Sequence, residues 1–123
     1  MDPQSLARVL GISRVVIGAA LLAVPKQAGG AWLGATAEQP AGQLPIASLG
    51  ARDVALGAGT VWATGGRKRE VRPWLLAAAV GDVADFAGAL RHREGLSTGA
   101  IALTVVMAGG GAAAGLWLAN ELD

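Results

Sequence analysis

The stretch Leu49 to Gly57, LGARDVALG, decides the fold because it places a basic and an acidic residue side by side inside an apolar run. That run extends from Pro45 to Thr64. About 20 helical residues are enough to cross a hydrocarbon layer about 30 Å thick. Charged side chains at that depth are costly unless they have partners. Arg52 and Asp53 therefore need partners on other helices.

The composition is that of a membrane protein. Of the 123 residues, 53% are hydrophobic and 15% are charged, whereas soluble domains carry roughly 25% charged residues. The mean hydropathy is +0.47. The 19 glycines agree with this class, because glycine is frequent in membrane helices. The length predicts one domain, residues 1–123.

Charge and residue usage exclude several kinds of function. A net charge of +1 gives no general field that would attract nucleic acid. The chain has no cysteine and a single histidine, His92, so it offers no disulfide, no thiolate nucleophile and no cluster of imidazoles for a metal. We therefore expect no catalytic residue, no cofactor and no enzymatic activity.

Four apolar segments predict an all-α integral membrane four-helix bundle with short loops. Pro45 and Pro73 are expected to open the second and third helices, because proline is tolerated at the first position of a helix. The connection Lys26–Leu44 is expected to be a loop or a short helix at the membrane interface, where Trp32 would lie. The four expected helices span about 5–24, 46–64, 74–90 and 97–119.

The first apolar segment also resembles a signal peptide, since basic residues precede its apolar run. Arg14 interrupts that run, and no cleavage site of small residues is well placed after it. These features favour a membrane helix that is retained.

The charges of the loops predict the orientation of the protein in the membrane. Four spans place both termini on the side of the Arg67–Arg72 turn, which carries four basic residues. The opposite side carries only Lys26, Arg91 and Arg93. Basic loops stay in the cytoplasm. We therefore expect a multi-pass protein of the bacterial cytoplasmic (inner) membrane with cytoplasmic N- and C-termini.

Glycines recur at a spacing of seven residues in three of the expected helices, which places each pair on one helical face. Small residues let helix backbones approach closely in lipid. The pattern is either an internal repeat or a requirement of tight packing, and the sequence leaves both open. The expected packing glycines are Gly11, Gly18, Gly50, Gly57, Gly81 and Gly88, together with the spaced pair Gly111 and Gly115 of the fourth helix.

The candidate site is a buried polar cluster. When Arg8 is included, the positive and negative charges in the spans balance. At 1.5 Å per residue, Arg14 lies at about 15 Å depth and Asp82 at about 12 Å. Asp53, Arg52 and Asp85 follow at about 10, 9 and 8 Å. These depths predict that Arg14 pairs with Asp82 or Asp53 and that Arg52 pairs with Asp85. The cluster consists of Arg14, Arg52, Asp53, Asp82 and Asp85.

Two interpretations of this cluster remain open. Balanced ion pairs would fix the register of the helices and stabilise a small bundle, and the balance favours this interpretation. Ionisable residues inside a membrane also mark sites for protons, ions or lipid headgroups.

Several short motifs together resemble a known group of proteins. The first helix ends in Pro25, Trp32-Leu33-Gly34 follows, Gly-Ala-Arg-Asp lies at 50–53, and Gly-Asp-x-x-Asp lies at 81–85. This order resembles small four-helix bacterial membrane proteins grouped as a domain of unknown function and common in actinobacteria. The resemblance implies a fold and a location, and it brings no activity.

Two functions are expected from these observations. The first is a non-catalytic accessory or structural subunit of a larger membrane complex of the transport or respiratory type. Its partners would be membrane lipids and other integral membrane subunits, or copies of itself. The alternative is a small transporter, or a protein that binds protons, ions or lipids through the Arg/Asp cluster as a homo-oligomer.

Reporter fusions test the orientation. Reporters at the N-terminus, at Arg69 and after Asp123 should all report the cytoplasm, because the positively charged turn stays there. A reporter near Gln39 should report the opposite side. If Gln39 and Arg69 report the same side, the second helix does not span the membrane.

Overall fold

The protein is entirely helical. The structure is a computed structural model that describes residues 1–123, of which 89% are helical and none forms a strand. The predicted all-α class is thus confirmed. In chain order the elements are α1 (Pro3–Ala23), α2 (Pro25–Leu33), the 3-10 helix η1 (Gly34–Glu38), α3 (Pro40–Ala63), α4 (Lys68–Arg91), the 3-10 helix η2 (Arg93–Gly95), α5 (Thr98–Thr104), the π-helical turn η3 (Val105–Gly109) and α6 (Gly110–Glu121).

Three helices are long and apolar enough to cross a membrane. They are α1, α4 and the continuous run Thr98–Glu121, which comprises α5, η3 and α6. Helix α3 is as long as α4 but is not among them. Arg52 and Asp53 lie near its middle and lower its hydropathy. The count of four spans therefore stays a prediction.

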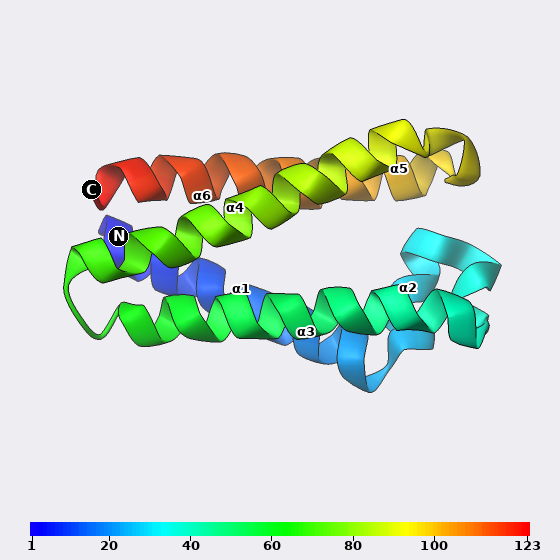
Figure 1. The fold of residues 1–123 in the computed structure, drawn as a ribbon, viewed down its shortest axis with the longest axis horizontal. Helices are drawn as coiled ribbons and strands as arrows, with labels where there is room; N and C mark the ends of the chain where they lie inside the picture. Colours follow the sequence, from blue (N-terminus) through cyan, green and yellow to red (C-terminus); the bar gives the residue numbers. More distant parts are fainter.

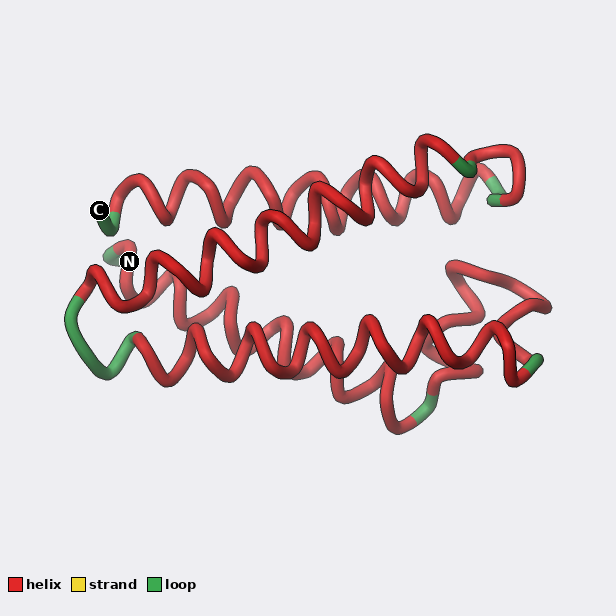
Figure 2. Tube along the Cα trace, in the orientation of Figure 1, coloured by secondary structure: helices red, strands yellow, loops and turns green.

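The long helices form two pairs. Helix α1 packs mainly on α3, and α4 packs mainly on α6 (Figure 1). The traces of the long helices run along a common direction, and a short turn joins α3 to α4 (Figure 2). The Gln4 side chain donates a hydrogen bond to the Thr64 carbonyl at 2.8 Å. Arg72 lies 3.4 Å from the Asp123 carboxylate. Both termini and the α3–α4 turn therefore lie at the same end of the molecule.

Two helices begin earlier than the sequence analysis predicts. Helix α3 begins at Pro40 and α4 at Lys68, so that Pro45 and Pro73 lie inside these helices. An internal proline removes one backbone hydrogen bond. Helices of 24 residues keep most of their hydrogen bonds despite that loss. Of the two alternatives for the connection before α3, the structure contains the short helix, which is α2.

The N-terminus of α1 is capped by Asp2. Its carboxylate accepts hydrogen bonds from the backbone N–H groups of Gln4 at 3.0 Å and Ser5 at 3.1 Å, and from the Ser5 hydroxyl at 2.6 Å. The hydroxyl and backbone hydrogen bonds of Ser5 lower the pKa of Asp2 below its ordinary value of 3.8. A lowered carboxyl pKa means that this cap stabilises α1 at neutral pH and is lost when the pH falls through the lowered value.

Glycines bring the backbones of α1 and α3 into contact. A Cβ atom on Gly11 would lie 2.9 Å from the Gly57 carbonyl oxygen, and one on Gly18 would lie 2.5 Å from that of Gly50. The contacts are reciprocal, because Cβ atoms on Gly50 and Gly57 would meet the Gly18 and Gly11 carbonyl oxygens at 2.7 and 2.5 Å. The glycines spaced seven residues apart in α1 and α3 therefore let these two antiparallel helices pack closely against each other.

The remaining predicted glycines behave differently from one another. Gly81 leaves room for the Arg52 guanidinium, whose Cζ would lie 3.2 Å from a Cβ atom. Gly115 lies against the backbone of Leu75 on α4, at 3.4 Å by the same measure. Gly88 has no atom within 4 Å of a Cβ position. The prediction that Gly88 packs against a helix is therefore wrong.

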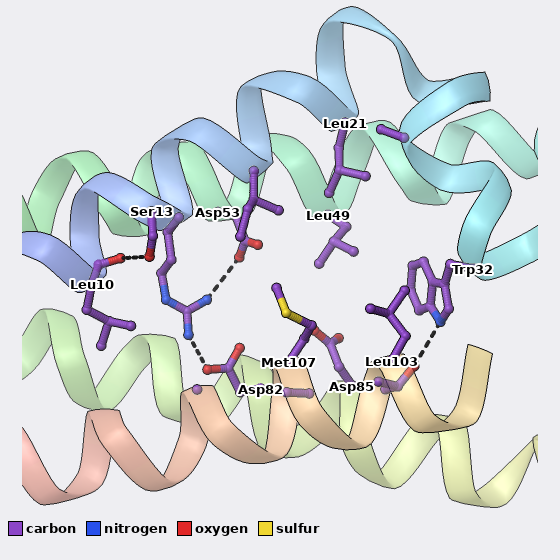
Figure 3. A pocket seen from close by; sticks show the side chains of 16 residues that line it. Leu10, Ser13, Leu21, Trp32, Leu49, Asp53, Asp82, Asp85, Leu103 and Met107 are labelled. Carbon is purple, nitrogen blue, oxygen red and sulfur yellow. Dashed lines mark hydrogen bonds and ion pairs between the residues drawn. The ribbon is translucent and has the colours of Figure 1, made fainter. Parts of the chain in front are cut away.

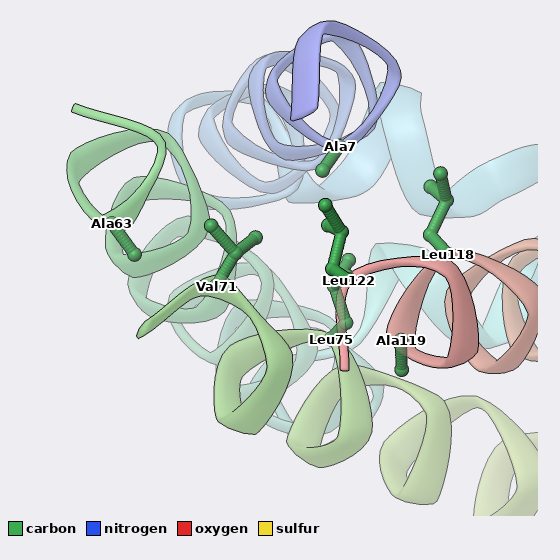
Figure 4. Close-up of a cluster of buried hydrophobic side chains, with 7 residues drawn as sticks. All are labelled: Ala7, Ala63, Val71, Leu75, Leu118, Ala119 and Leu122. Atoms are coloured by element: carbon green, nitrogen blue, oxygen red, sulfur yellow. The ribbon is translucent and has the colours of Figure 1, made fainter. Parts of the chain in front are cut away.

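Buried apolar side chains gather in two clusters, one toward each end of the molecule. The larger cluster lies at the end that holds the termini and joins all four long helical runs (Figure 4). The smaller cluster, Leu21, Ala37 and Ile46, lies under η1 at the other end. The larger cluster consists of Ala7, Ala63, Val71, Leu75, Leu118, Ala119 and Leu122.

Substitution of the interface glycines tests this arrangement. Gly18→Ala should lower the free energy of unfolding by about 1–3 kcal/mol, because the added methyl group meets backbone atoms that cannot move aside. Thermal unfolding in a fixed detergent measures the loss. Gly88→Ala, also inside a long helix, is the matched control and should be neutral or slightly stabilising. Equal effects of the two variants would show that α1 and α3 do not meet at Gly18.

Candidate functional site

The five predicted cluster residues lie together near the middle of the long helices. Arg14 of α1 is the central donor. Its Nη1 donates to Oδ1 of Asp53 at 3.2 Å, and its Nη2 donates to Oδ2 of Asp82. Arg14 therefore binds both carboxylates that the sequence analysis gives as alternatives, one on α3 and one on α4.

A second guanidinium extends the network. Arg52 of α3 donates to both oxygens of Asp85 on α4, at 3.1 and 2.6 Å. Two parallel hydrogen bonds of this kind fix orientation as well as distance. Nη2 of Arg52 also lies 3.6 Å from Oδ1 of Asp53. Asp53 is therefore shared between the two arginines, and the five side chains form one connected network.

The network is not electrically balanced. Arg8, which completes the neutral count in the sequence analysis, is exposed on α1 and makes no ion pair. Two guanidiniums therefore face three carboxylates. The predicted charge balance of the spans therefore does not hold within the network, because position in the sequence does not show that Arg8 points away from the other helices.

Several polar atoms of the network are unused. Oδ2 of Asp53 and Oδ1 of Asp82 accept no hydrogen bond, and neither atom is enclosed by protein. The Nε–H groups of Arg14 and Arg52 are buried without an acceptor. An arginine has five N–H donors, and the carboxylates occupy only part of them. The network is thus open at its carboxylates.

These carboxylates face a cavity of about 230 Å³ between the two helix pairs (Figure 3). Its charged wall consists of Arg14, Asp53, Asp82 and Asp85, and its other walls are mostly apolar. Helix α2 and the run Thr98–Glu121 contribute no titratable group to it. The remaining lining residues are Leu10, Ser13, Ile17, Leu21, Ala28, Trp32, Leu49, Leu103, Thr104, Met107, Ala108 and Gly111.

Trp32 closes the cavity at the end away from Arg14. Its indole Nε1 donates a hydrogen bond to Oγ1 of Thr104 at 3.0 Å, which links α2 to α5 (Figure 3). Thr104 in turn donates to the Ala100 carbonyl at 2.9 Å. The sequence predicts that Trp32 lies at the membrane interface, and no sequence pattern indicates a role for Thr104. A tryptophan between two apolar segments was the available signal, but its partner lies 72 residues away in the chain.

The π-helical turn η3 forms part of the same wall. Met107 and Ala108 lie in this turn and line the cavity, and Gly111 follows directly in α6. A Cβ atom on Gly111 would lie 2.5 Å from Oδ2 of Asp82 and 3.2 Å from Nη2 of Arg14. Gly111, which the sequence predicts to be a packing glycine, therefore makes room for the ion pair between Arg14 and Asp82. π-Helical turns occur frequently at functional sites.

The cavity opens sideways. Its exposed lining residues are Ser13 and Ile17 on α1, and Leu103 and Met107 on the facing α5–η3 segment. The lining residues on α3 and α4 are buried or half-buried. The opening therefore lies between α1 and the α5–η3 segment, on the flank of the helices rather than at their ends.

A second hollow lies on the other side of Trp32 and Asp85. It measures about 360 Å³ and is lined further by Gly88 and His92. Gly88 borders this hollow, which explains why no atom lies within 4 Å of its Cβ position. Its other lining residues are Ala84, Ala89, Gly95 and Leu96.

Comparison with known proteins brings no functional assignment. No family model, no curated protein and no solved structure matches the chain. The resemblance to the small four-helix bacterial family therefore stays a prediction. No group of three or more histidine, aspartate or glutamate side chains is arranged to hold a metal ion.

A double-mutant cycle tests the Arg52–Asp85 pair. Asp85→Asn and Arg52→Gln should each lower thermal stability in a fixed detergent. A broken buried pair costs about 3–5 kcal/mol in soluble proteins, and couplings between membrane helices average about 0.6 kcal/mol. We expect a loss between these limits. The double variant should recover part of the loss, because both charges are then removed. Strictly additive losses would show that the two side chains do not interact.

Proposed function

We propose that this chain is a small four-span membrane protein that binds a cation at its buried carboxylates, with a proton as the resting occupant. The observation that carries the proposal is the excess of one carboxylate in the network, with two carboxylate oxygens open to the cavity. The three long apolar helices support a membrane location.

The proposed topology includes α3 as the fourth span. Its charged residues are paired with α1 and α4, which removes the main cost of placing α3 in lipid. The basic turn from Arg67 to Arg72 and both termini lie at one end of the helices, which supports a cytoplasmic location for that end. The membrane proposed is the bacterial inner membrane.

The charge imbalance favours an occupied site. Insertion of one charged residue at the centre of a membrane helix costs about 2.5–3.5 kcal/mol, and more without water or a partner. Arg14 and Arg52 neutralise two carboxylates, and the third leaves a net negative charge near mid-membrane. Uptake of a proton or a monovalent cation removes that charge. Asp53 and Asp82 are the candidates to bind it, because each has a free oxygen at the cavity.

A purely structural network would have a different form. Its charges would balance and its oxygens would all be satisfied, because both features minimise the cost of burial. The Arg52–Asp85 pair has this closed form. The part around Arg14, Asp53 and Asp82 does not. The two ends of one network thus support different roles: orientation at Asp85 and binding at Asp53 and Asp82.

The accessory-subunit hypothesis has less support from the same geometry. It depends on small-residue helix faces that are free to dock a partner. In the structure Gly11, Gly18, Gly50 and Gly57 face one another across the α1–α3 contact and are used inside the chain. That hypothesis stays a prediction, and native purification in mild detergent with identification of bound proteins would test it.

Infrared spectroscopy tests for the bound proton. Protein in lipid nanodiscs at neutral pH, in a buffer whose only cation is large and hydrophilic, should show the carbonyl band of a protonated carboxyl group. The band should shift in protein made with isotope-labelled aspartate, and it should be lost or weakened in Asp53→Asn or Asp82→Asn. Asp123→Asn, which changes an exposed carboxylate, is the matched control and should keep the band. Absence of the band from the unsubstituted protein would overturn the proposal.

A further inference from the structure

The charged wall of the cavity is suited to a ligand that donates hydrogen bonds. Oδ2 of Asp53 and Oδ1 of Asp82 are acceptors without partners, and both lie on the accessible side of the network. Arg14, the nearest cation, is already bound to both residues. The excess charge is negative, so that an anion entering the cavity would be repelled. A positively charged N–H group would meet two free carboxylate oxygens.

The rest of the cavity is suited to hydrocarbon. Leu21, Leu49, Leu103 and Met107 line it, and the indole of Trp32 forms its far end. The flexible thioether of Met107 adapts to irregular apolar shapes. An inorganic cation would leave this apolar volume empty, whereas an organic cation with a short apolar part would fill it.

The size of the cavity limits the ligand. A water molecule takes up about 30 Å³ in the liquid. A cavity of about 230 Å³ therefore holds on the order of eight non-hydrogen atoms. Sites for drug-sized ligands usually measure roughly 300–1,000 Å³. The cavity is thus suited to a short alkylammonium or a compound of similar size.

The position of the opening indicates the route of entry. The exposed lining residues Ile17, Leu103 and Met107 surround an opening on the flank between α1 and the α5–η3 segment. In the proposed topology that flank faces lipid. A ligand that uses this route must dissolve in the membrane, as a hydrophobic amine does.

We propose that the cavity binds a small lipid-soluble alkylammonium ion, with its ammonium group on Asp53 and Asp82 and its hydrocarbon part directed toward Trp32. This proposal rests on the cation-binding function proposed above. An ammonium that enters a protonated site replaces the resting proton. The carboxyl O–H bond breaks, the electron pair stays on the carboxylate oxygen, and one proton leaves to water for each ammonium bound.

Calorimetry with three probes of matched size tests the proposal. The protein in nanodiscs is titrated with heptylammonium, heptanol and hexanoate, and empty nanodiscs supply the correction for partition into lipid. Heptylammonium should bind about tenfold or more tightly than heptanol, because it adds charge-assisted hydrogen bonds. Hexanoate should show no saturable binding. Titrations in two buffers of different ionisation enthalpy should show release of one proton per bound ammonium.

Two substitutions localise the binding without changing a charge. Ala108→Met fills the cavity from η3 and should abolish saturable heptylammonium binding. Ala102→Met places the same side chain on the exposed surface of α5, outside the cavity, and should leave binding unchanged. The comparison of the three probes on the unsubstituted protein remains decisive if Ala108→Met fails to fold.

The outcomes separate this inference from the function on which it rests. Heptylammonium that binds no more tightly than heptanol, in a protein that shows the protonated-carboxyl band, overturns the ligand class and leaves the proton site in place. Absence of both the band and the binding overturns both proposals. Tight binding that survives Ala108→Met would place the amine elsewhere and overturn the assignment to this cavity.

Discussion

The contact between Arg14 and the two carboxylates around it determines how the molecule is held together. The chain folds into two helix pairs, α1 with α3 and α4 with α6, and each pair is stabilised by its own close contacts. Between the pairs, packed apolar side chains fill the end that holds the termini, and the Trp32–Thr104 hydrogen bond links α2 to α5 toward the other end. In the middle, Arg14 connects α1 to α3 through Asp53 and to α4 through Asp82. Without this guanidinium the centre of the protein would contain unpaired carboxylates beside an open cavity.

The glycines and the charges depend on each other. Close contact of α1 and α3 at Gly11 and Gly57 brings Arg14 within reach of Asp53, since a Cβ atom on Gly57 would lie 2.9 Å from Cβ of Arg14. On the other pair, Gly111 provides the space that Asp82 needs. Larger residues at these positions would separate the helices or displace the carboxylate. Tight backbone packing is therefore the condition under which the ion pairs form.

Sequence reasoning reached the helical class and the five cluster residues for a physical reason: charges are costly in an apolar helix, so each needs a partner at a similar depth. Depth along a helix does not report direction around it. That is why Arg8 enters the predicted charge balance of the spans, although it points outward. Depth also made Asp53 and Asp82 alternatives for Arg14, although one guanidinium binds both. The starts of α3 and α4 predicted from Pro45 and Pro73 are too late in the chain, because long helices accept an internal proline. The cavity and the Trp32–Thr104 contact depend on side chains far apart in the chain, and no local pattern predicts them.

The π-helical turn η3 changes the rotation along the helical run Thr98–Glu121. Ala100, Thr104, Ala108 and Ala112 are all buried and recur every four residues. In a regular α-helix of 3.6 residues per turn, such a row drifts by about 40° at each step. A wider turn absorbs the drift, so that Thr104 before it and Ala112 after it are both buried. The π-helical turn thus keeps this row of small side chains on the buried face of the helix.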